Sequence, residues 1–159
     1  MRIRTGTWFK TKVKYQKTME DGSEKVVSEA YVVDALSFTE AESAIIEEMS
    51  VYVSGELKVS NLGKASYNEI FFSDVDDDDK FYTCKLQFIT IDEKSEKEKR
   101  SNVTYLVQAK SLARALRYVD DAMGKTMIDY DIVGLNETKV FDVFEHHAPS
   151  SENKEEKNE

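Results

Sequence analysis

The sequence predicts an α+β protein made by tandem duplication of a ββαβ unit. Two observations carry this prediction: a strand that runs directly into an amphipathic helix at residues 31–49, and a second occurrence of that pattern beginning at Tyr105. We expect the two copies, residues 8–72 and 81–145, to form a pseudo-two-fold, mostly antiparallel sheet or half-open barrel with two helices on one face.

The first copy opens with a predicted hairpin. Between residues 8 and 17, Phe9, Val13 and Tyr15 alternate with basic side chains, as in a strand that has one buried face. The turn residues at 20–23 then predict a return strand over residues 25–35. Residues 1–7 are expected to form a loose arm or the start of a strand.

A helix follows the hairpin, because apolar residues recur at the spacing of one helix face: Phe38, Ala41, Ile45 and Met49. Thr39 and Glu42 fit a capping box, and the helix should end near Ser50. A further strand is expected over residues 56–59, and residues 67–72 fit either a short helix or a fourth strand.

The duplication itself is indicated by apolar residues that align between the copies. At a shift of 74, Tyr31 and Met49 align with Tyr105 and Met123, and outside this core the shift is 73. The flanking alignment pairs Trp8, Phe9, Val13 and Tyr15 with Phe81, Tyr82, Leu86 and Phe88. Each unit is too small to bury much surface alone, so we expect both to share one core within a single domain, residues 1–147.

The linker between the copies, residues 73–80, contains five aspartates that repel one another, so we expect an exposed loop. It also contains the recognition sequence of enteropeptidase, which predicts ready cleavage after Lys80. Residues 148–159 contain no large apolar side chain and are expected to be a disordered acidic tail.

Composition indicates an ordinary globular protein of 159 residues, 33% of them charged, with a net charge of −9. The single cysteine fits a reducing, cytoplasmic setting, and we expect no membrane segment because no apolar stretch approaches the length of a span. The net charge disfavours a purely electrostatic grip on nucleic acid, although the segment 1–19 carries six basic side chains and no acid.

No enzyme is predicted, and no catalytic residue is assigned. His146 and His147 stand beside the predicted tail, Cys84 fits a small core residue, and nucleotide-binding or nucleophile motifs are missing. We also expect no cofactor and no metal. The aspartates of the linker have alternate spacing, but an EF-hand requires glycine and glutamate where the chain has Asp79 and Lys85.

The candidate binding residues lie on the polar side of the first strand of each copy: Trp8, Lys10, Lys12, Lys14, Phe81 and Lys85. Aromatic rings that stack on bases, beside lysines that follow phosphates, are typical of proteins that bind single-stranded nucleic acid. The alternative interpretation is that both rings pack under a neighbouring element and that the lysines form an ordinary solvated face.

The phrase Val-Asp-Ala-Leu-Ser-Phe-Thr-Glu-Ala-Glu at residues 33–42 resembles an uncharacterised domain family of Bacteroides-group bacteria, their phages and mobile elements. The Trp8-Phe9 start, residues 88–90 and the closing residues 141–144 share this resemblance, which covers about residues 5–147. It brings no established activity or site residues. It implies a small intracellular protein of bacterial or phage origin, which favours an accessory role in DNA replication or recombination.

Two functional hypotheses remain open. The first is a non-enzymatic binding module for single-stranded nucleic acid in phage or mobile-element DNA metabolism. The second is a protein–protein interaction or assembly factor without a nucleic-acid ligand, in which Trp8 and Phe81 lie at a contact with a protein partner or a second copy.

Overall fold

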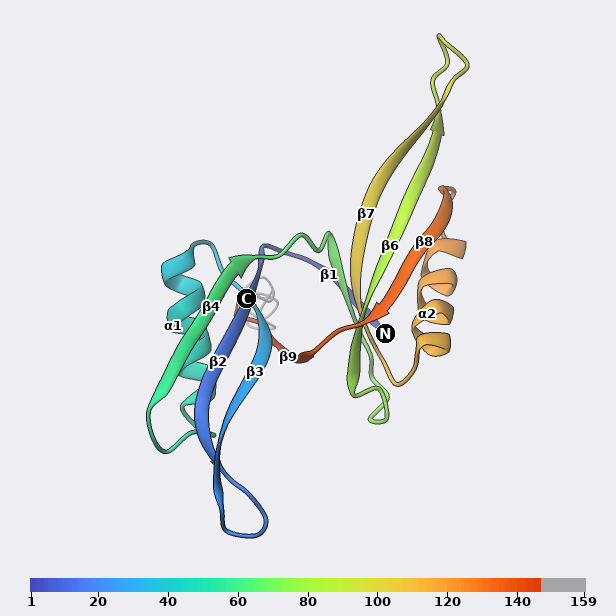
Figure 1. Ribbon diagram of the computed structural model, residues 1–159. Coiled ribbons are helices and arrows are strands. Elements are labelled where there is room, and N and C mark those ends of the chain that lie inside the picture. Colours follow the sequence, from blue (N-terminus) through green and yellow to red (C-terminus); the bar gives the residue numbers. More distant parts are fainter. Residues whose placement is uncertain (147–159) are drawn as a thin grey trace, which may run out of the picture. The chain divides into compact units, whose positions relative to one another are not determined.

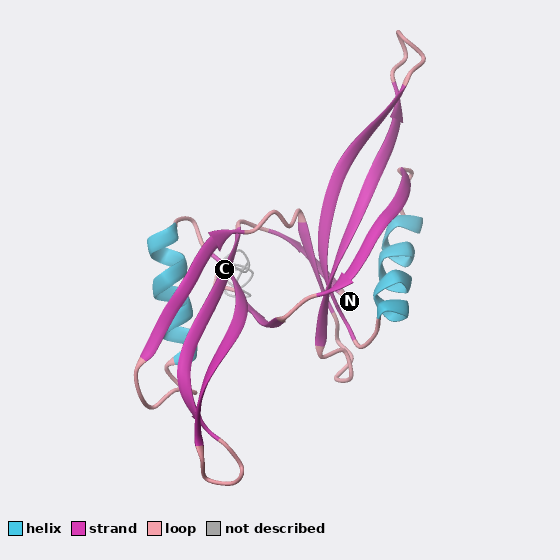
Figure 2. Cartoon of the chain, viewed as in Figure 1, coloured by secondary structure: helices cyan, strands magenta, loops and turns pink. Residues whose placement is uncertain are grey.

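The computed structural model describes residues 1–146, and it confirms the α+β class. The chain forms two compact units, one made of residues 1–6 and 66–141 and the other of residues 7–65 together with the chain from Asp142. Each unit contains one open sheet and one helix (Figures 1 and 2). The expected tail, residues 148–159, lies outside the described residues.

The unit that contains the first hairpin has a four-stranded sheet in the order β4-β2-β3-β9. Its elements are β2 (Trp8–Thr18), β3 (Glu24–Asp34), α1 (Phe38–Met49), β4 (Leu57–Lys64) and β9 (Val140–Phe144). The predicted hairpin is confirmed: β2 pairs antiparallel with β3 along its whole length. Gly22 has a φ of +84°, a backbone conformation that favours glycine in its turn.

The other unit has a five-stranded sheet in the order β1-β5-β7-β6-β8. Its elements are β1 (Arg2–Thr5), β5 (Glu69–Phe72), β6 (Lys80–Ile91), β7 (Glu98–Ala109), α2 (Leu112–Gly124) and β8 (Asp129–Glu137). β5 runs parallel to β7, whereas β1 pairs antiparallel with β5, and β6 with β7 and β8. The segment 1–7 therefore contains a strand, and residues 69–72 form a strand rather than a helix.

Each helix covers its own sheet. α1 buries Ala41, Ile45 and Met49 among side chains of β2 and β3 that include Phe9 and Val33. In the other unit, the aligned positions Ala115, Val119 and Met123 are buried among Tyr82, Leu86 and Val107. The strands are therefore divided between two sheets, instead of forming the one sheet with both helices on a face that the sequence predicted. Each amphipathic helix already finds an apolar face in its own hairpin.

The cap of the first helix lies two residues before the predicted position. Ser37 Oγ accepts a hydrogen bond from Glu40 N at 3.1 Å, and the Glu40 carboxylate accepts one from Leu36 N at 3.1 Å. In the other helix, Ser111 Oγ accepts from Arg114 N at 3.1 Å. The capping interaction is thus made by Ser37 and Glu40 rather than by Thr39 and Glu42, because the helix begins at Phe38.

The end strands of the two halves are exchanged between the sheets. β5 follows β4 in the chain but pairs with β7, and β9 follows β8 but lies next to β3. Gln108 Oε1 accepts a hydrogen bond from Ser73 N, just after β5, at 2.9 Å. At the corresponding place, the Asp34 carboxylate accepts one from His146 N, just after β9. Both incoming strands are therefore fixed by a side chain at the end of the strand that receives them.

Further details correspond between the two sheets. The pairing of β2 with β4 shifts register between Lys12 and Val13, and that of β6 with β8 shifts between Lys85 and Leu86. Trp8 O accepts from Ala65 N at 2.8 Å, and Phe81 O accepts from Thr138 N at 2.9 Å. All these pairs are related by the shift that aligns Trp8 with Phe81. They are correspondences of fold, and a common origin of the two halves stays a prediction.

The aspartate linker is packed more closely than predicted. Four of its aspartates are exposed, but Asp78 is only 2% exposed. Its carboxylate accepts hydrogen bonds from Ser73 Oγ, from Tyr118 OH at 2.5 Å and from Lys110 N at 2.9 Å, and it lies 3.4 Å from an Arg114 nitrogen. Asp78 therefore ties the linker to the junction of β7 and α2.

The Asp78 carboxyl has a pKa below its ordinary value of 3.8. Burial acts to raise the pKa, but the hydrogen bonds from Ser73, Tyr118, Lys110 and Arg114 favour the charged form and outweigh it. Since the folded-state pKa is lowered, the ionised group stabilises the fold above the unfolded pKa. This contribution is lost as the pH falls through the folded-state value.

We predict that Asp78→Asn lowers the free energy of unfolding by about 3 kcal/mol at neutral pH, because it disrupts a buried charge that accepts several hydrogen bonds. Asp76→Asn, at an exposed position of the same linker, should change it by no more than about 0.5 kcal/mol. Urea unfolding followed by circular dichroism measures both. The difference in free energy of unfolding between wild type and Asp78→Asn should be smaller at about pH 3 than at neutral pH. A difference that is constant with pH would contradict the role of the ionised carboxylate.

The packing of the linker changes the expected rate of cleavage by enteropeptidase after Lys80. Asp78 is buried, and Lys80 is already paired with Ala109 at the start of β6. We therefore predict that enteropeptidase cuts the native protein slowly after Lys80 and cuts urea-unfolded protein quickly. Gel analysis of timed digests measures both rates, and Asp78→Asn should raise the rate for native protein. Equal rates for native and unfolded wild-type protein would show that the segment is free.

Candidate nucleic-acid interface

The three lysines of β2 share one face of the four-stranded sheet. Side chains alternate along a strand, and Phe9, Val13 and Tyr15 face α1. Lys10, Lys12 and Lys14 therefore lie on the opposite side, which we call the outer face of the sheet, and all three are exposed. The structure thus brings these three predicted residues together in one row.

A fourth lysine joins this row from the neighbouring strand. Lys58 of β4 is the cross-strand partner of Lys14 and is also exposed. Like charges directly opposite each other destabilise a sheet, so this pairing has no structural benefit of its own. We refer to Lys10, Lys12, Lys14 and Lys58 as the lysine face. The sequence places Lys58 on the polar side of a strand, but it does not reveal the register that brings it beside Lys14.

The direct cross-strand partners of the three lysines of β2 include no acidic residue. The cross-strand partners of Lys10, Lys12 and Lys14 on β3 are Val32, Ala30 and Ser28. On β4 they are Gly63, Asn61 and Lys58. None of these residues is acidic, although the chain as a whole has a net charge of −9. The lysine face is therefore a local concentration of positive charge on an acidic protein.

The two aromatic residues of the predicted site, Trp8 and Phe81, are buried. Trp8 is 1% exposed and Phe81 is 2% exposed, so neither ring presents a face on which a base could stack. Both lie at the first residues of long strands, where the outer face is covered: Val32 and Leu106, on the same faces, are fully buried, and Asp34, the cross-strand partner of Trp8, is buried too. The alternation of apolar and polar residues predicts the correct face of the sheet for both rings, but it does not predict which end of that face is exposed to solvent.

Lys85 lies on the outer face of the other sheet, on β6, and it is exposed. Its aliphatic stem runs close to Gly134 of β8: a Cβ on that glycine would lie 3.7 Å from Lys85 Cβ. The surrounding face is polar and mixed in charge. Arg100, for example, donates to Asp131 at 2.7 Å and to Gln87 at 3.2 Å. Lys85 therefore stands in a different electrostatic setting from the lysines of β2.

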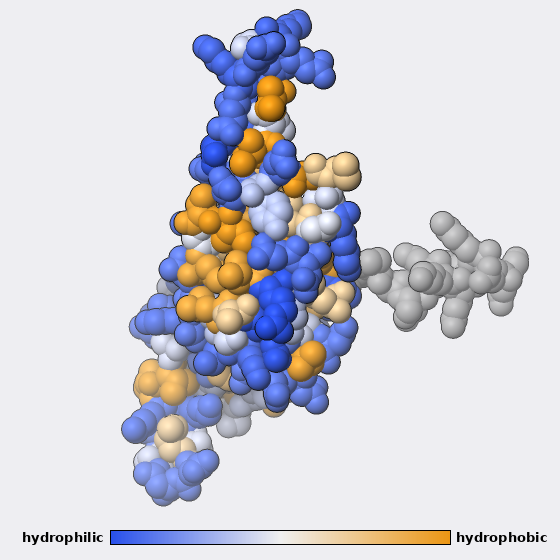
Figure 3. All heavy atoms as spheres, turned by 90° about the vertical axis from the view of Figure 1, so that its right-hand side faces the viewer, coloured by the Kyte–Doolittle hydropathy of each residue, from blue (hydrophilic) through white to orange (hydrophobic). Residues whose placement is uncertain are grey.

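The far end of this second sheet carries charges of both signs. A hollow of about 680 Å³ there is lined by Ile89, Ile91, Glu96, Glu98, Asp129 and Tyr130. The tip of the β6–β7 hairpin beyond it is hydrophilic, as the upper end of Figure 3 shows. Because three acidic residues line this hollow, the four-stranded sheet is the better candidate for binding anions.

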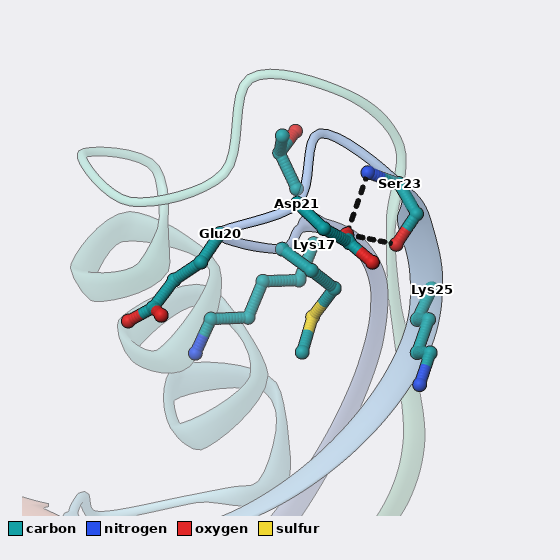
Figure 4. Close-up of a pocket in the computed structure, with 7 residues that line it drawn as sticks. Lys17, Glu20, Asp21, Ser23 and Lys25 are labelled. Atoms are coloured by element: carbon teal, nitrogen blue, oxygen red, sulfur yellow. Dashed lines mark hydrogen bonds between the residues drawn. The ribbon is translucent and has the colours of Figure 1, made fainter.

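Two more lysines face each other near the tip of the β2–β3 hairpin. Lys17 and Lys25 are cross-strand partners and line an open hollow of about 480 Å³ around the turn (Figure 4). The Asp21 carboxylate is occupied within this turn, because it accepts hydrogen bonds from both N and Oγ of Ser23. The hollow is therefore a feature of an exposed turn, with its cations on the side of the sheet opposite to the lysine face.

The groups that most often perform catalysis are used structurally. Cys84 is fully buried, and its burial, with a smaller effect from Asp120, raises the pKa of the thiol to about 11. His146, which the sequence places beside the predicted tail, is held by Glu48, whose Oε1 lies 2.9 Å from its Nε2. Within residues 1–146, no group of three or more His, Cys, Asp or Glu is placed to hold a metal ion.

The hydroxyls of Tyr15 and Tyr31 meet at one carboxylate. Both donate to Glu29 Oε1, at 2.5 Å and 3.1 Å. Burial, followed by this hydrogen bond and the charge of Glu29, raises the pKa of Tyr15 to about 12. Both tyrosines therefore remain protonated donors at neutral pH, and the cluster satisfies polar atoms beside the core rather than supplying a base.

Comparisons with known proteins identify the chain at the level of a family. Residues 7–146 match the family described as a domain of unknown function, DUF4494. The chain belongs to this family, and the match spans nearly all the residues that the structure describes. Searches of curated proteins and of solved structures found no significant match. None of the helices in the described residues is long and apolar enough to cross a membrane.

We predict that Trp8→Ala acts on stability and not directly on binding. Removing a fully buried indole should cost about 3–5 kcal/mol, whereas Lys12→Ala at an exposed position should cost no more than about 0.5 kcal/mol. Thermal unfolding of the two variants measures this contrast. A Trp8→Ala variant as stable as wild type would show that the ring is not packed.

Proposed function

We propose that the protein is a non-enzymatic binding module whose lysine face binds the phosphate backbone of single-stranded nucleic acid. The observation that carries the proposal is the row of Lys10, Lys12 and Lys14 on one face of β2, extended by Lys58 of β4. A cytoplasmic setting in phage or mobile-element DNA metabolism belongs to the same proposal.

The spacing of the lysines supports this ligand. Residues two apart on an antiparallel strand are separated by about 6.8 Å, which is close to the distance between successive phosphates in an extended single strand. The strand can therefore run along β2 with one lysine for each phosphate. Lys58, on the neighbouring strand, then supplies a fourth phosphate contact beside Lys14.

Burial of Trp8 and Phe81 changes the expected character of binding. Without an exposed ring, no base-stacking energy is available from these residues, and the interaction is mainly electrostatic. Such binding is weak, tolerant of sequence and strongly dependent on salt. The ligand is therefore the sugar–phosphate backbone, and we expect little preference among bases.

The second hypothesis, an assembly factor with Trp8 and Phe81 at a subunit contact, loses its specific support. Both rings are already buried within one chain. A ring that is covered in the isolated chain gains little from a partner surface. We therefore favour the nucleic-acid ligand for the lysine face.

We predict that labelled oligothymidylate binds the wild-type protein and that Lys12→Glu, Lys14→Glu weakens binding by at least about tenfold at low salt. Four phosphate contacts to a single strand predict a log–log salt slope of about −3, or about a 50-fold loss between 50 and 200 mM salt. Fluorescence anisotropy measures both quantities. The slope of the double variant should be about half that of the wild type.

The matched control is Lys94→Glu, Lys97→Glu, in the exposed turn between β6 and β7. It makes the same change in net charge, far along the chain from the lysine face. If both double variants lose affinity equally, net charge and not the lysine face explains binding. Binding that is absent, or insensitive to salt, in the wild type would refute the proposal.

A further inference from the structure

The two sheets differ at one edge. In the five-stranded sheet, β5 lies between β7 and β1, and β1 pairs with it antiparallel through Arg2 with Phe72 and Arg4 with Ile70. In the four-stranded sheet, β9 takes the place of β5, next to β3. Among residues 1–146, no strand pairs with the other edge of β9. The five-stranded sheet thus has a strand, β1, at a position where the four-stranded sheet has none among the described residues.

The chain cannot fill this position with the equivalent of β1. The shift that aligns the surrounding strands, Trp8 with Phe81, relates β1 to the segment 75–78, which reads Val-Asp-Asp-Asp. Successive carboxylates disfavour a strand, and Asp78 is held instead by Ser73, Lys110 and Tyr118. The segment that would pair with β9 is therefore used as a turn in the other unit.

β9 is also the least protected of the four sheet edges. Edge strands usually carry cations or bulges that prevent pairing with other chains. β4 has Lys58, Lys64 and a register shift, β8 has a register shift and several acids, and β1 has two arginines. β9 has the sequence Val-Phe-Asp-Val-Phe, with no basic residue, and Phe141 is 61% exposed. Such an edge is a template for an added strand.

We propose that the outer edge of β9 binds an extended, basic segment of a partner protein, which adds to the four-stranded sheet as a fifth strand. β1 indicates the chemistry of this segment, because it fills the same position on β5 with arginine at alternate residues. There the Arg2 guanidinium lies 4.4 Å from the centroid of the Phe72 ring. On β9, exposed Asp142 and the net charge of −9 favour a cationic segment.

The length of β9 sets the size of the segment. Five residues, Val140–Phe144, can pair with a strand of about the same length, as the four residues of β1 do on β5. Main-chain hydrogen bonds supply the affinity in this mode of recognition, and alternate side chains supply the selectivity. The edge of β9 shares no residue with the lysine face, so this inference stands or fails separately from the proposed function.

The test uses a fluorescein-labelled peptide with the sequence of residues 1–7 of this chain, added to the full-length protein without nucleic acid. We expect saturable one-to-one binding in fluorescence anisotropy. A peptide with glutamate in place of both arginines should bind at least about tenfold more weakly. A peptide with alternate backbone nitrogens methylated should also lose binding, because it cannot form the ladder of a sheet.

Two variants locate the site. Asp142→Lys should weaken binding by at least about tenfold, and Asp129→Lys, the same charge change on the edge strand β8, should leave it unchanged. Failure of the peptide to bind would overturn the proposal, and so would equal binding of the methylated peptide, which reports charge attraction alone. Loss with Asp129→Lys instead of Asp142→Lys would assign the peptide to a different edge and would also overturn it. The methylated and unmethylated peptides are compared on the wild-type protein, so this comparison does not depend on how the variants fold.

Discussion

The exchange of β5 and β9 between the two sheets is the constraint on which the rest of the structure depends. Each half of the chain builds a three-stranded sheet with its own helix and then sends its last strand to the sheet of the other half. Gln108 and Asp34 fix the arriving strands by accepting backbone hydrogen bonds from Ser73 and His146. Neither sheet is complete without residues from the other half, which couples two units that have separate helices.

The correspondence between the halves makes their differences informative. The same bulge, the same backbone contacts and the same helix-cap serine recur at equivalent positions. Two features do not recur. The outer face of one sheet carries a row of lysines whereas the other is mixed in charge, and within residues 1–146 β1 has no counterpart beside β9. Both proposals are drawn from these departures, because residues that only maintain a shared fold should have equivalents in both halves.

Much of the local structure could be predicted from the sequence, because short-range patterns determine it. Alternation in residues 8–17 and helical spacing in residues 38–49 gave the strands, the helix and the buried side of each. The lysines of β2 were assigned to the correct face for the same reason. Long-range pairing could not be read in this way. No local signal tells that β5 joins β7, that Lys58 lies beside Lys14, or that Asp78 alone among five aspartates is buried.

The same limit explains why the burial of Trp8 and Phe81 could not be predicted from the sequence. A period of two residues separates the faces of a strand, but both faces of a sheet can be covered, and each of these strands begins in such a region. An aromatic residue beside lysines is therefore ambiguous in a sequence. It marks a stacking surface only where the neighbouring residues on the same face are exposed, and here Val32 and Leu106 are buried.

Cys84 has a use that follows from its position. It is the only cysteine in the chain, it lies in β6 beneath α2, and its thiol is uncharged at neutral pH because its pKa is about 11. An alkylating reagent can reach it only when the helix and the sheet of that unit separate. The chain thus carries a native chemical reporter for one of its two units, and the rate of thiol modification measures how often that unit opens while the other is left unlabelled.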